Sequence, residues 1–335
     1  MRRHPRLSII VVTYNSQAVI ANCLNYIRKQ SYSSYEVIVV DNASSDKTLE
    51  LLSKYSWIKL IRNIENLGFS KANNQGVEQA KGEFILLLNP DAFLSDSALD
   101  ILVNSMKSDF SLGFVCPKLL KPNNKNIIDS TGIQATPERR FFDRGRGEVD
   151  HHQYDSQTDI FAGCGAALLL RKTALDDIKI GNEYLDNDFF AYFEDVDLCW
   201  RMRLRGWKGL YCPKAIVYHQ RGQDIDDYEK QPLFAFLKKR LSQWGDKRTR
   251  KIRSLVFINS LLILIKNASF LELSRNIISL FSYWFRRILY LLFIESYVFF
   301  PLLSHTRRLF LILKKRFYIR KRLLIEDKDL RRYFS

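Results

Sequence analysis

The stretch LLLNPDAFL, residues 86–94, decides the fold of this chain. An apolar run stops there at an amide, a proline and a carboxylate, and an apolar pair follows. Similar apolar runs occupy LSIIVVTYN (7–15), YEVIVVDNASSD (35–46) and WIKLIRN (57–63), and segments with helical signals separate them. Continuous apolar strands that alternate with helices predict an α/β fold with a mostly parallel central sheet and helices on both faces.

Polar side chains end three of these apolar runs. They are Tyr14 with Asn15, Asp41 with Asn42, and Asn89 with Asp91. Ligands of open parallel sheets bind beyond the carboxyl ends of the strands. We therefore predict that the three polar clusters converge on one edge of the sheet. The alternative at residues 89–91 is a plain turn in which Asp91 caps a helix.

Composition excludes several classes of protein. The chain has 335 residues, of which 47% are hydrophobic, so it is long enough for a sizeable core. Its five cysteines are scattered without a CxxC pair, which argues against a zinc site or a disulfide framework and suits a reducing compartment. The first apolar run covers only residues 7–12, too short for a signal peptide, and we expect a protein that is not secreted.

The net charge of +16 is concentrated in the last hundred residues. Residues 237–335 hold 23 Lys and Arg against 6 Asp and Glu, whereas the rest of the chain is close to neutral. This asymmetry predicts a globular domain at 1–236 and a basic region at 237–335 that meets an anionic partner. Within the first domain, the polar residues 121–160 are expected to form an irregular, mobile insertion.

The basic region also contains apolar runs, at residues 255–265, 277–285 and 288–303, with clusters of Lys and Arg around them. None reaches the roughly 20 uninterrupted residues of a simple spanning helix. Apolar helices rich in Lys, Arg, Trp and Phe favour helices that lie in the interface of an anionic membrane. Two alternatives remain: a helical subdomain that packs on the first domain or dimerises, and a true span. A nucleic-acid arm is disfavoured, because it does not need such apolar runs.

Six motifs in order resemble the family 2 glycosyltransferases of the GT-A fold. They are SIIVVTYNS, VIVVDNASSD, NLGFSKANNQG, LLLNPDA, FAGCGAALLLRK and FFAYFEDVDLCWRMRLRGW, followed by IVYH. The subgroup that they resemble most is the rhamnosyltransferase type of bacterial surface-polysaccharide synthesis. The resemblance covers residues 7–219 and implies a Rossmann-like GT-A domain with a nucleoside-diphosphate sugar as donor.

The resemblance implies a divalent metal, Mg²⁺ or Mn²⁺, that neutralises the leaving diphosphate. The family usually has Asp-x-Asp where this chain has Asn89-Pro90-Asp91. Asp91 is then the expected metal ligand, and Asn89 is expected to contact the ribose or a water on the metal. A histidine at the place of His219 completes the metal site in some members. The alternative for His219 is an ordinary polar strand end.

The same resemblance implies a donor pocket built from the first half of the chain. Asp41 and Asn42 correspond to the position that holds the base or ribose. Gly68 and Gly163 are expected to allow close approach of the backbone to the ligand. Lys71 either adds a positive charge to the pocket or is a solvated surface lysine. The expected donor-binding residues are Thr13, Tyr14, Asn15, Asp41, Asn42, Gly68, Lys71, Asn73, Asn89 and Gly163.

Glu194 and Asp195 resemble the acidic pair of the family. Transfer to a hydroxyl needs a base that removes the acceptor proton. Asp195 is the expected base, and Glu194 is expected to orient the acceptor or Asp195. The helix that follows is predicted from Val196, Cys199, Trp200 and Leu204 and ends at Gly206. We expect Asp197 to form an ion pair on the helix surface with Arg201.

Together these features predict an inverting enzyme that adds single sugars. SQWGD (242–246) only faintly resembles the QxxRW motif of processive synthases, which favours single addition. The expected donor is dTDP-rhamnose, with UDP-galactose, UDP-glucose and UDP-N-acetylglucosamine as alternatives. The expected acceptor is a polyprenyl-diphosphate-linked glycan at the cytoplasmic face of the cell membrane, where the enzyme is peripheral. An inactive scaffold is the alternative of another class, and the oligomeric state is left open.

Overall fold

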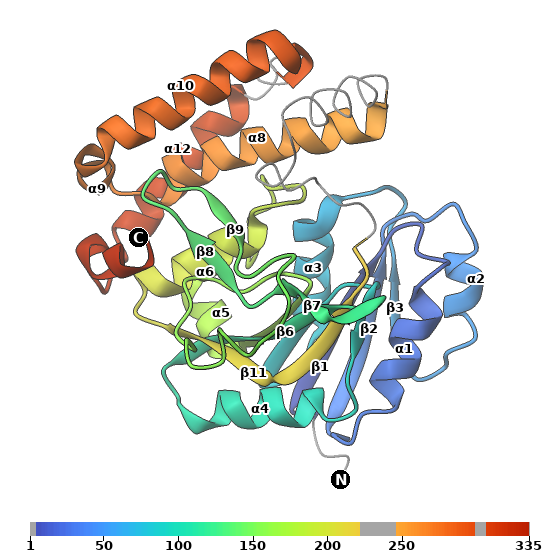
Figure 1. The fold of residues 1–335 in the computed structure, drawn as a ribbon. Coiled ribbons are helices and arrows are strands. Elements are labelled where there is room, and N and C mark those ends of the chain that lie inside the picture. Colours follow the sequence, from blue (N-terminus) through green and yellow to red (C-terminus); the bar gives the residue numbers. More distant parts are fainter. Residues whose placement is uncertain (1–4, 222–245, 299–305, 335) are drawn as a thin grey trace.

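A twisted sheet of nine strands forms the centre of the molecule (Figure 1). The computed structural model describes residues 5–221, 246–298 and 306–334. Along the sheet the strand order is β3-β2-β1-β4-β10-β6-β11-β5, and β7 pairs with β6. The strands are β1 (Leu7–Thr13), β2 (Tyr35–Asp41), β3 (Lys59–Arg62), β4 (Phe84–Leu88), β5 (Ala92–Leu94), β6 (Leu112–Lys121), β7 (Asn124–Ser130), β10 (Ala167–Arg171) and β11 (Lys208–His219); β8 (Ile133–Ala135) and β9 (Phe141–Asp143) form a separate pair.

The helices cover both faces of the sheet, as predicted. Those of the first 221 residues are α1 (Ile20–Arg28), α2 (Thr48–Leu52), α3 (Gly68–Gln79), α4 (Ala98–Ser108), α5 (Lys172–Ile178) and α6 (Glu194–Leu204). Those that follow are α8 (Lys247–Asn267), α9 (Phe270–Arg275), α10 (Ile277–Ile294) and α12 (Thr306–Arg320), with short 3₁₀ turns η1 (Ser296–Val298) and η2 (Asp327–Tyr333).

Alternation along β1 shows why the sheet holds two layers of helices. Leu7, Ile9 and Val11 pack with α1 and α4, whereas Ile10 faces the opposite side with α3, α5 and α6. Successive side chains of a strand point to opposite faces, so an unbroken apolar run is buried only if both faces are covered. The strands from β3 to β4 are all parallel, and β10 then enters antiparallel between β4 and β6. The sheet is therefore parallel in its first half and mixed in its second.

The segment 121–160 forms regular strands, where the sequence predicts an irregular, mobile insertion. It contains β7, β8 and β9, and Ile128 and Ala135 are fully buried. The buried guanidinium of Arg144 donates to the hydroxyl of Thr131 over 2.9 Å and to its carbonyl over 2.9 Å. Long polar side chains that satisfy backbone carbonyls hold this segment against the sheet, a contact that composition alone does not reveal.

The C-terminal helices pack on the first domain, as one alternative expected. Phe257, Ile258 and Ile263 of α8 are buried in the same core as Trp200 of α6, and the ring of Phe334 packs at a tilt against Trp200 with ring centroids 5.5 Å apart. Figure 1 shows α8, α10 and α12 forming a layer beside α6. The expected boundary at 236/237, most of SQWGD and the basic cluster at 238–240 lie outside the described residues.

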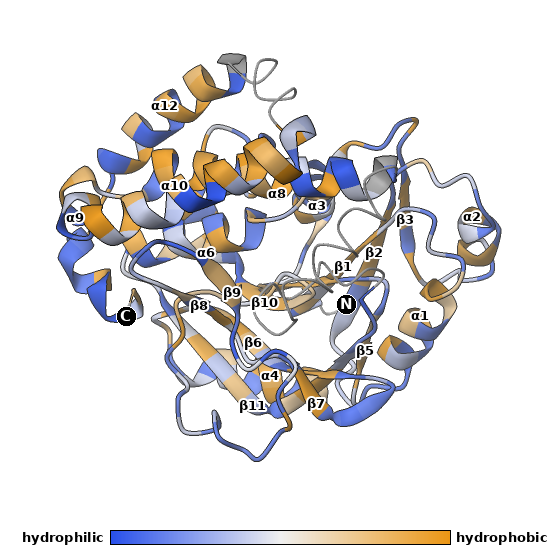
Figure 2. Ribbon diagram, turned by 45° about the horizontal axis from the view of Figure 1, so that its top comes forward, coloured by the Kyte–Doolittle hydropathy of each residue, from blue (hydrophilic) through white to orange (hydrophobic). Residues whose placement is uncertain are grey.

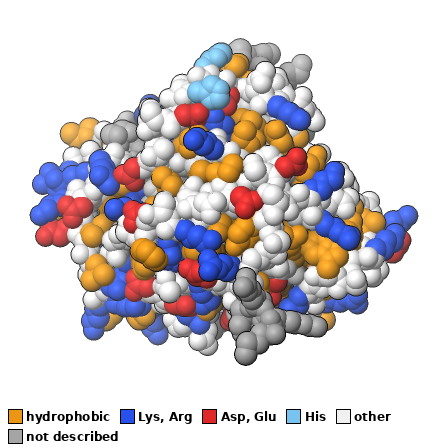
Figure 3. Space-filling model, turned by 90° about the horizontal axis from the view of Figure 1, so that it is seen from below, with side chains coloured by type: hydrophobic (Ala, Val, Ile, Leu, Met, Phe, Trp, Pro, Cys, Tyr) orange, Lys and Arg blue, Asp and Glu red, His pale blue; other side chains and the backbone are white. Residues whose placement is uncertain are grey.

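Helix α10 exposes many apolar side chains to the outside, and α9 and α12 also expose some. Phe281 is 67% exposed and Phe293 is 82% exposed, and Figure 2 shows hydrophobic residues all along this helix. Its 18 residues are long and apolar enough to cross a membrane by length and composition alone, and only 6% of them are buried. The opposite side of the molecule, in contrast, carries Lys and Arg mixed with Asp and Glu (Figure 3).

Candidate active site

The carboxyl ends of β1, β2 and β4 meet at one edge of the sheet, as predicted. Thr13 lies opposite Asp41 in the register of β1 and β2, and Val11 lies opposite Leu88 in that of β1 and β4. The hydroxyl of Thr13 donates to Asp41 over 3.0 Å, and the amide N–H of Asn42 donates to the carbonyl of Thr13 over 2.8 Å. These contacts join the first two polar clusters directly.

The carboxylate of Asp41 is buried and is oriented by three donors. Besides Thr13, the hydroxyl of Ser44 donates to it over 2.6 Å and the amide N–H of Ser44 over 3.0 Å. The Asn42 side chain bridges from β2 to the carbonyl of Gly68 at the start of α3, over 3.0 Å. Tyr14 is 52% exposed at the rim of this region. The site therefore has a rigid polar floor with an exposed aromatic ring beside it.

Three of the residues expected to contact the nucleotide-sugar donor lie against protein atoms in this structure. A Cβ at Gly68, whose φ is +83°, would lie 2.5 Å from the carbonyl oxygen of Phe190. A Cβ at Gly163 would lie 2.5 Å from Leu168. The buried side chain of Asn73 donates to the carbonyl of Phe69 in its own helix over 2.9 Å. In this structure the two glycines admit neighbouring protein atoms, and Asn73 stabilises the start of α3.

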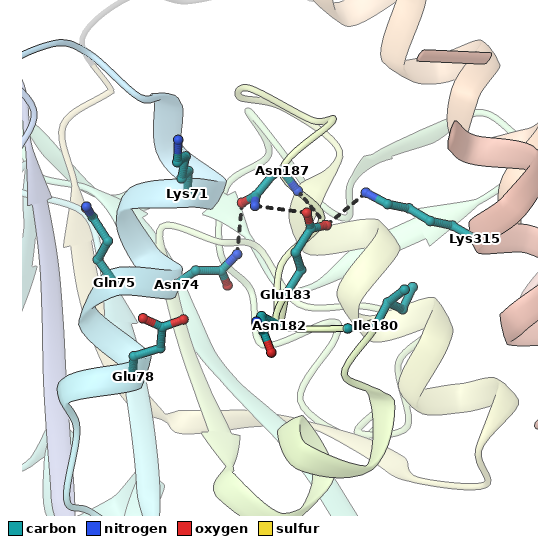
Figure 4. Close-up of a pocket in the computed structure, with 10 residues that line it drawn as sticks. Lys71, Asn74, Gln75, Glu78, Ile180, Asn182, Glu183, Asn187 and Lys315 are labelled. Atoms are coloured by element: carbon teal, nitrogen blue, oxygen red, sulfur yellow. Dashed lines mark hydrogen bonds and ion pairs between the residues drawn. The ribbon is translucent and has the colours of Figure 1, made fainter. Parts of the chain in front are cut away.

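Lys71 is exposed and lines a separate cavity of about 420 Å³ between α3, the loop at 180–187 and α12 (Figure 4). The other side chains there are largely engaged with one another. Asn74 donates to Asn187 over 3.0 Å, Asn187 donates to Glu183 over 3.0 Å, and Lys315 donates to Glu183 over 2.8 Å. The position of Lys71 fits the solvated-lysine alternative as well as a charge beside the donor.

Asp91 and His219 lie side by side, although 127 residues separate them. The NPD segment forms a turn in which the amide N–H of Ala92 donates to the carbonyl of Asn89 over 3.1 Å. β5 then pairs with β11, with Ala92 opposite His219. This pairing brings the Nε2 of His219 to 3.4 Å from Oδ1 of Asp91. A turn exists here, as the alternative expected, but strand β5 follows it, so Asp91 does not cap a helix. The turn also places the carboxylate beside the histidine.

Two further acidic residues and an arginine surround this pair. The Nδ1 of His219 lies 2.8 Å from the buried carboxylate of Asp129. Arg221 donates to Asp129 over 2.6 Å and to Asp143 over 2.6 Å. Burial alone would raise the pKa of Asp129, but the hydrogen bond with His219 and the charge of Arg221 lower it to about 2. Burial alone would lower the pKa of His219, and its two carboxylate partners raise it to about 9.

The donor set of this cluster fits a divalent metal. Asp91 offers a hard carboxylate oxygen, which Mg²⁺ and Mn²⁺ both prefer, and His219 offers an imidazole nitrogen, which suits a transition metal such as Mn²⁺ better than Mg²⁺. Further positions remain for phosphate and water. Asp129 accepts from Nδ1–H and so directs Nε2 toward Asp91, the usual role of a carboxylate behind a metal-binding histidine. The Asp150, His152 and Asp155 group is a poorer candidate, because Lys118 lies 2.8 Å from both of its carboxylates.

Asp195 and Glu194 begin α6 after a turn of unusual backbone geometry. Tyr192 has a φ of 73° and Phe193 a φ of 70°. The amide N–H of Gly165 donates to Asp195 over 2.8 Å, and that of Val196 over 2.8 Å. Burial raises the pKa of Asp195 to about 6 and that of the Glu194 carboxyl well above its usual range. Among the described residues, Oε2 of Glu194 has no hydrogen-bond partner.

The segment 164–166 places this acidic pair beside the Asp91 turn. The amide N–H of Gly165 holds Asp195, and the carbonyl of the next residue, Ala166, accepts the amide N–H of Asn89 over 2.9 Å. Burial raises the pKa of the intervening Cys164 thiol, and the charges of Asp143, Asp195 and Asp129 raise it further. A carboxylate with a pKa near neutrality therefore lies next to the candidate metal ligands, which is the arrangement of a general base beside an electrophilic centre.

Comparison with known proteins identifies the family of this chain. The family model described as glycosyl transferase family 2 matches residues 8–178, half of the chain. The chain belongs to that family. Its fold is the GT-A fold.

The relatives of this family member are distant. The poly-β-1,6-N-acetyl-D-glucosamine synthase of Staphylococcus aureus is 24% identical over 229 residues, 63% of this chain and 49% of that protein. The synthase of Staphylococcus epidermidis is 23% identical over 239 residues, 67% and 52% of the two chains. The chain thus spans about half the length of the relatives it matches. The crystal structure of GalNAc-T7 with UDP, GalNAc and Mn²⁺ shares the fold, with a TM-score of 0.53 and 16% identity over 66% of this chain and 45% of that one.

Sequence reasoning missed Asp129, Asp143 and Arg221 of this family member. Asp129 follows the apolar pair Ile127-Ile128, the same strand-end pattern as Asp41, but its segment was expected to be irregular. Asp197 does pair with Arg201, over 2.9 Å, yet the pair is buried and not on the helix surface as expected. α8 covers that face of α6, and Lys266 reaches Asp197 over 2.8 Å.

Proposed function

We propose that this glycosyltransferase moves one sugar from a nucleoside-diphosphate donor to a hydroxyl of a membrane-held glycan, with inversion at the anomeric carbon. One observation carries the proposal: Asp91 and His219 lie together, and Asp195 is tied to the adjacent backbone. Direct displacement at the anomeric carbon requires two separate groups. The leaving diphosphate needs its negative charge neutralised, whereas the attacking hydroxyl needs a base that takes its proton.

Each residue has a proposed task. Asp91 and His219 would hold the divalent metal, which neutralises the leaving diphosphate when bound. Asp41 would accept a hydrogen bond from the base or the ribose, with Thr13 and Ser44 fixing its orientation. Asp195 takes the proton of the acceptor hydroxyl as its oxygen bonds to the anomeric carbon. The bond from that carbon to the diphosphate oxygen breaks, and its electron pair leaves with the nucleotide.

Glu194 is proposed as a neutral partner of the acceptor. Burial and the charge of Asp195 favour its protonated form, which can donate a hydrogen bond. The two carboxyls would then divide the work: neutral Glu194 orients the acceptor, and Asp195, which titrates near neutrality, removes the proton of its hydroxyl. Asn89 sits in the same turn as Asp91 and is proposed to contact the ribose or a metal-bound water.

The donor sugar is the finer part of the proposal. The motifs resemble rhamnosyltransferase-type enzymes, which favours dTDP-rhamnose. The names of the relatives, synthases of a poly-N-acetyl-D-glucosamine, favour UDP-N-acetylglucosamine. UDP-galactose and UDP-glucose remain in the test. Because these two relatives are only 24% and 23% identical to the chain, dTDP-rhamnose and UDP-N-acetylglucosamine are both tested as donors.

Membrane attachment is proposed from α10. Its outward residues Ile278, Phe281 and Phe293 are more than half exposed, and water alone gives no reason to collect them on one helix. The exposed cations Arg286, Lys314 and Lys321 lie on α10, on α12 and just after α12, respectively. Burial of aromatic side chains together with basic residues favours an anionic lipid surface at the cytoplasmic face, where a polyprenyl-diphosphate-linked acceptor would be held.

Calorimetry with full-length, detergent-purified protein tests the donor site. UDP and dTDP are titrated with and without Mn²⁺ into the parent and into Asp91→Ala. We expect metal-dependent binding of one nucleotide in the parent and its loss in the variant. Sugar transfer to a hydroxyl acceptor is then measured with the donors of the tighter nucleotide. Binding of neither nucleotide under any metal condition would exclude the proposal and favour an inactive scaffold.

A further inference from the structure

We propose that Asn259, on α8 of the C-terminal region, is a positioning residue for the acceptor base Asp195. The inference rests on the proposed function of Asp195. It adds a residue that lies outside the part of the chain matched by the family model, residues 8–178. It also gives the C-terminal helices a role in the reaction besides any contact with a membrane.

The turn at residues 191–193 needs an outside support. Tyr192 and Phe193 both have φ values near +70°, a region that residues with a Cβ adopt only when their surroundings impose it. Phe193 is the residue that precedes α6, so this turn sets where the helix begins. Glu194 and Asp195 are the first two residues of the helix. Relaxation of the turn toward ordinary dihedrals would therefore move both carboxyls.

Asn259 supplies that support through a single side chain. It is fully buried, and its Nδ2 group donates to the carbonyl of Ala191 over 2.8 Å and to that of Tyr192 over 2.9 Å. The amide has two N–H groups, so both donors are spent on consecutive carbonyls of the turn. Without these two hydrogen bonds, the carbonyls of Ala191 and Tyr192 would lose the Asn259 donor beneath α8. Rotation of the backbone away from α8 would then lower the free energy of the turn.

α8 itself is anchored on both sides of this turn, so Asn259 is held in place. Lys266 contacts Asp186, before the turn, over 2.5 Å and Asp197, after it, over 2.8 Å. Asn267 donates to Asp197 over 2.8 Å. Lys315 of α12 adds contacts to Asp186 and Asp188, and Figure 4 shows it reaching toward this loop from the C-terminal layer. The helix layer therefore clamps the loop, and Asn259 sets the turn within it.

The test compares full-length Asn259→Leu with the parent and with Ser260→Ala. Leucine has the same branched skeleton as asparagine, although it is larger, and it has no donor. Ser260 is the neighbouring residue, and among the described residues its hydroxyl donates within α8, to the carbonyl of Phe257 over 2.6 Å. Three quantities are measured: kcat for sugar transfer at saturating donor, the Kd of the nucleotide with Mn²⁺ by calorimetry, and the same kcat in an Asp195→Asn background. Asn259→Ala is made in parallel in case the leucine variant does not fold.

We expect Asn259→Leu to lower kcat about 10- to 100-fold, the usual cost of a misplaced catalytic group, while the nucleotide Kd stays within about twofold. Ser260→Ala should match the parent. In the Asp195→Asn background the further loss from Asn259→Leu should be under about twofold, because residues that act as a unit are non-additive.

Two outcomes would overturn the inference alone: a parent that transfers sugar while both Asn259 variants keep its kcat, or a loss of nucleotide affinity as large as the loss of kcat. A parent that transfers no sugar from any donor would instead remove the proposed function and this inference with it.

Discussion

The Nε2 of His219 lies 3.4 Å from Oδ1 of Asp91. Asp91 directly precedes β5, which runs antiparallel to β11, and His219 is the last residue of β11. Two ligands of one octahedral ion with bonds of about 2.1 Å stand about 3 Å apart. The pair is therefore spaced as neighbouring ligands are. Without a metal, a shared proton accounts for the same contact, because the pKa of His219 is raised to about 9.

Removal of either member of the pair should abolish metal-dependent donor binding. Asp91→Ala and His219→Ala each remove one of the two proposed protein ligands, so the Mn²⁺-dependent gain in nucleotide affinity should fall more than 100-fold, roughly the loss of one direct ligand. A chelator should do the same to the parent. Calorimetry with and without Mn²⁺ measures this, and Asp96→Ala, at an exposed acid nearby, serves as the control. Unchanged Mn²⁺ dependence in both variants would place the metal elsewhere.

Asp129→Asn tests the support behind the histidine. The substitution keeps the shape of the side chain but removes the charge that holds Nδ1–H, so Mn²⁺ affinity should fall about 10- to 100-fold. A Mn²⁺ titration of transferase activity gives the apparent affinity. The matched substitution Asp176→Asn, at a half-exposed carboxylate of α5, should leave it unchanged. Equal Mn²⁺ affinities in the parent and in Asp129→Asn would show that His219 needs no such partner.

The pH dependence of transfer should report Asp195. Its pKa is raised to about 6 by burial, and the base works only when it has lost its proton. At saturating Mn²⁺, kcat/KM should therefore be constant above pH 7 and fall about tenfold per pH unit below pH 6. Asp195→Asn should lower kcat/KM by about 100- to 10,000-fold and remove this dependence. A parent profile that stays flat down to pH 5 would rule out Asp195 as the base.

Lys266 should be essential for stability. It is fully buried between the carboxylates of Asp186 and Asp197, and Lys266→Met would leave these charges with one cation fewer. Loss of one partner of a buried ionic group costs about 3–5 kcal/mol of unfolding free energy. Denaturant unfolding measures it, and exposed Lys214→Met should change stability by less than about 0.5 kcal/mol. A loss below about 1 kcal/mol in Lys266→Met would mean that the network is not an anchor of the C-terminal layer.

The exposed face of α10 should bind anionic lipid. Phe281→Asp combined with Phe285→Asp removes two stacked aromatic rings from that face and adds two negative charges. Sedimentation with vesicles containing phosphatidylglycerol should show at least tenfold weaker binding than the parent, as expected for loss of roughly 1.5–3 kcal/mol per buried side chain. Ile64→Asp, at a fully exposed apolar residue far along the chain, is the control. Equal vesicle binding of the double variant and the parent would leave α10 as a site for a protein partner.

The sequence by itself determined the α/β fold, the polar strand ends and the acidic pair. These features depend on local patterns: apolar runs of strand length, the residues that stop them, and helical spacing after Glu194. Through motif resemblance, the sequence also predicts that Asp91 and His219 are metal ligands. The sequence predicts that Gly68 and Gly163 contact the ligand, whereas in the structure a Cβ at either would meet protein atoms. Sequence shows that space is needed at a glycine but not which atoms occupy it.

Only the tertiary structure decided which distant residues share the site. β5 pairs with β11, and this pairing alone brings His219 to Asp91. Asp129 joins them because segment 121–160 folds onto the sheet, and Asn259 reaches the turn before Asp195 because α8 packs on α6. The charge asymmetry predicts that the C-terminal region stands apart, whereas its buried Lys266 forms ion pairs with Asp186 and Asp197 of the first domain. Such contacts arise from packing between segments that are far apart in the sequence, so no periodic pattern of residues predicts them.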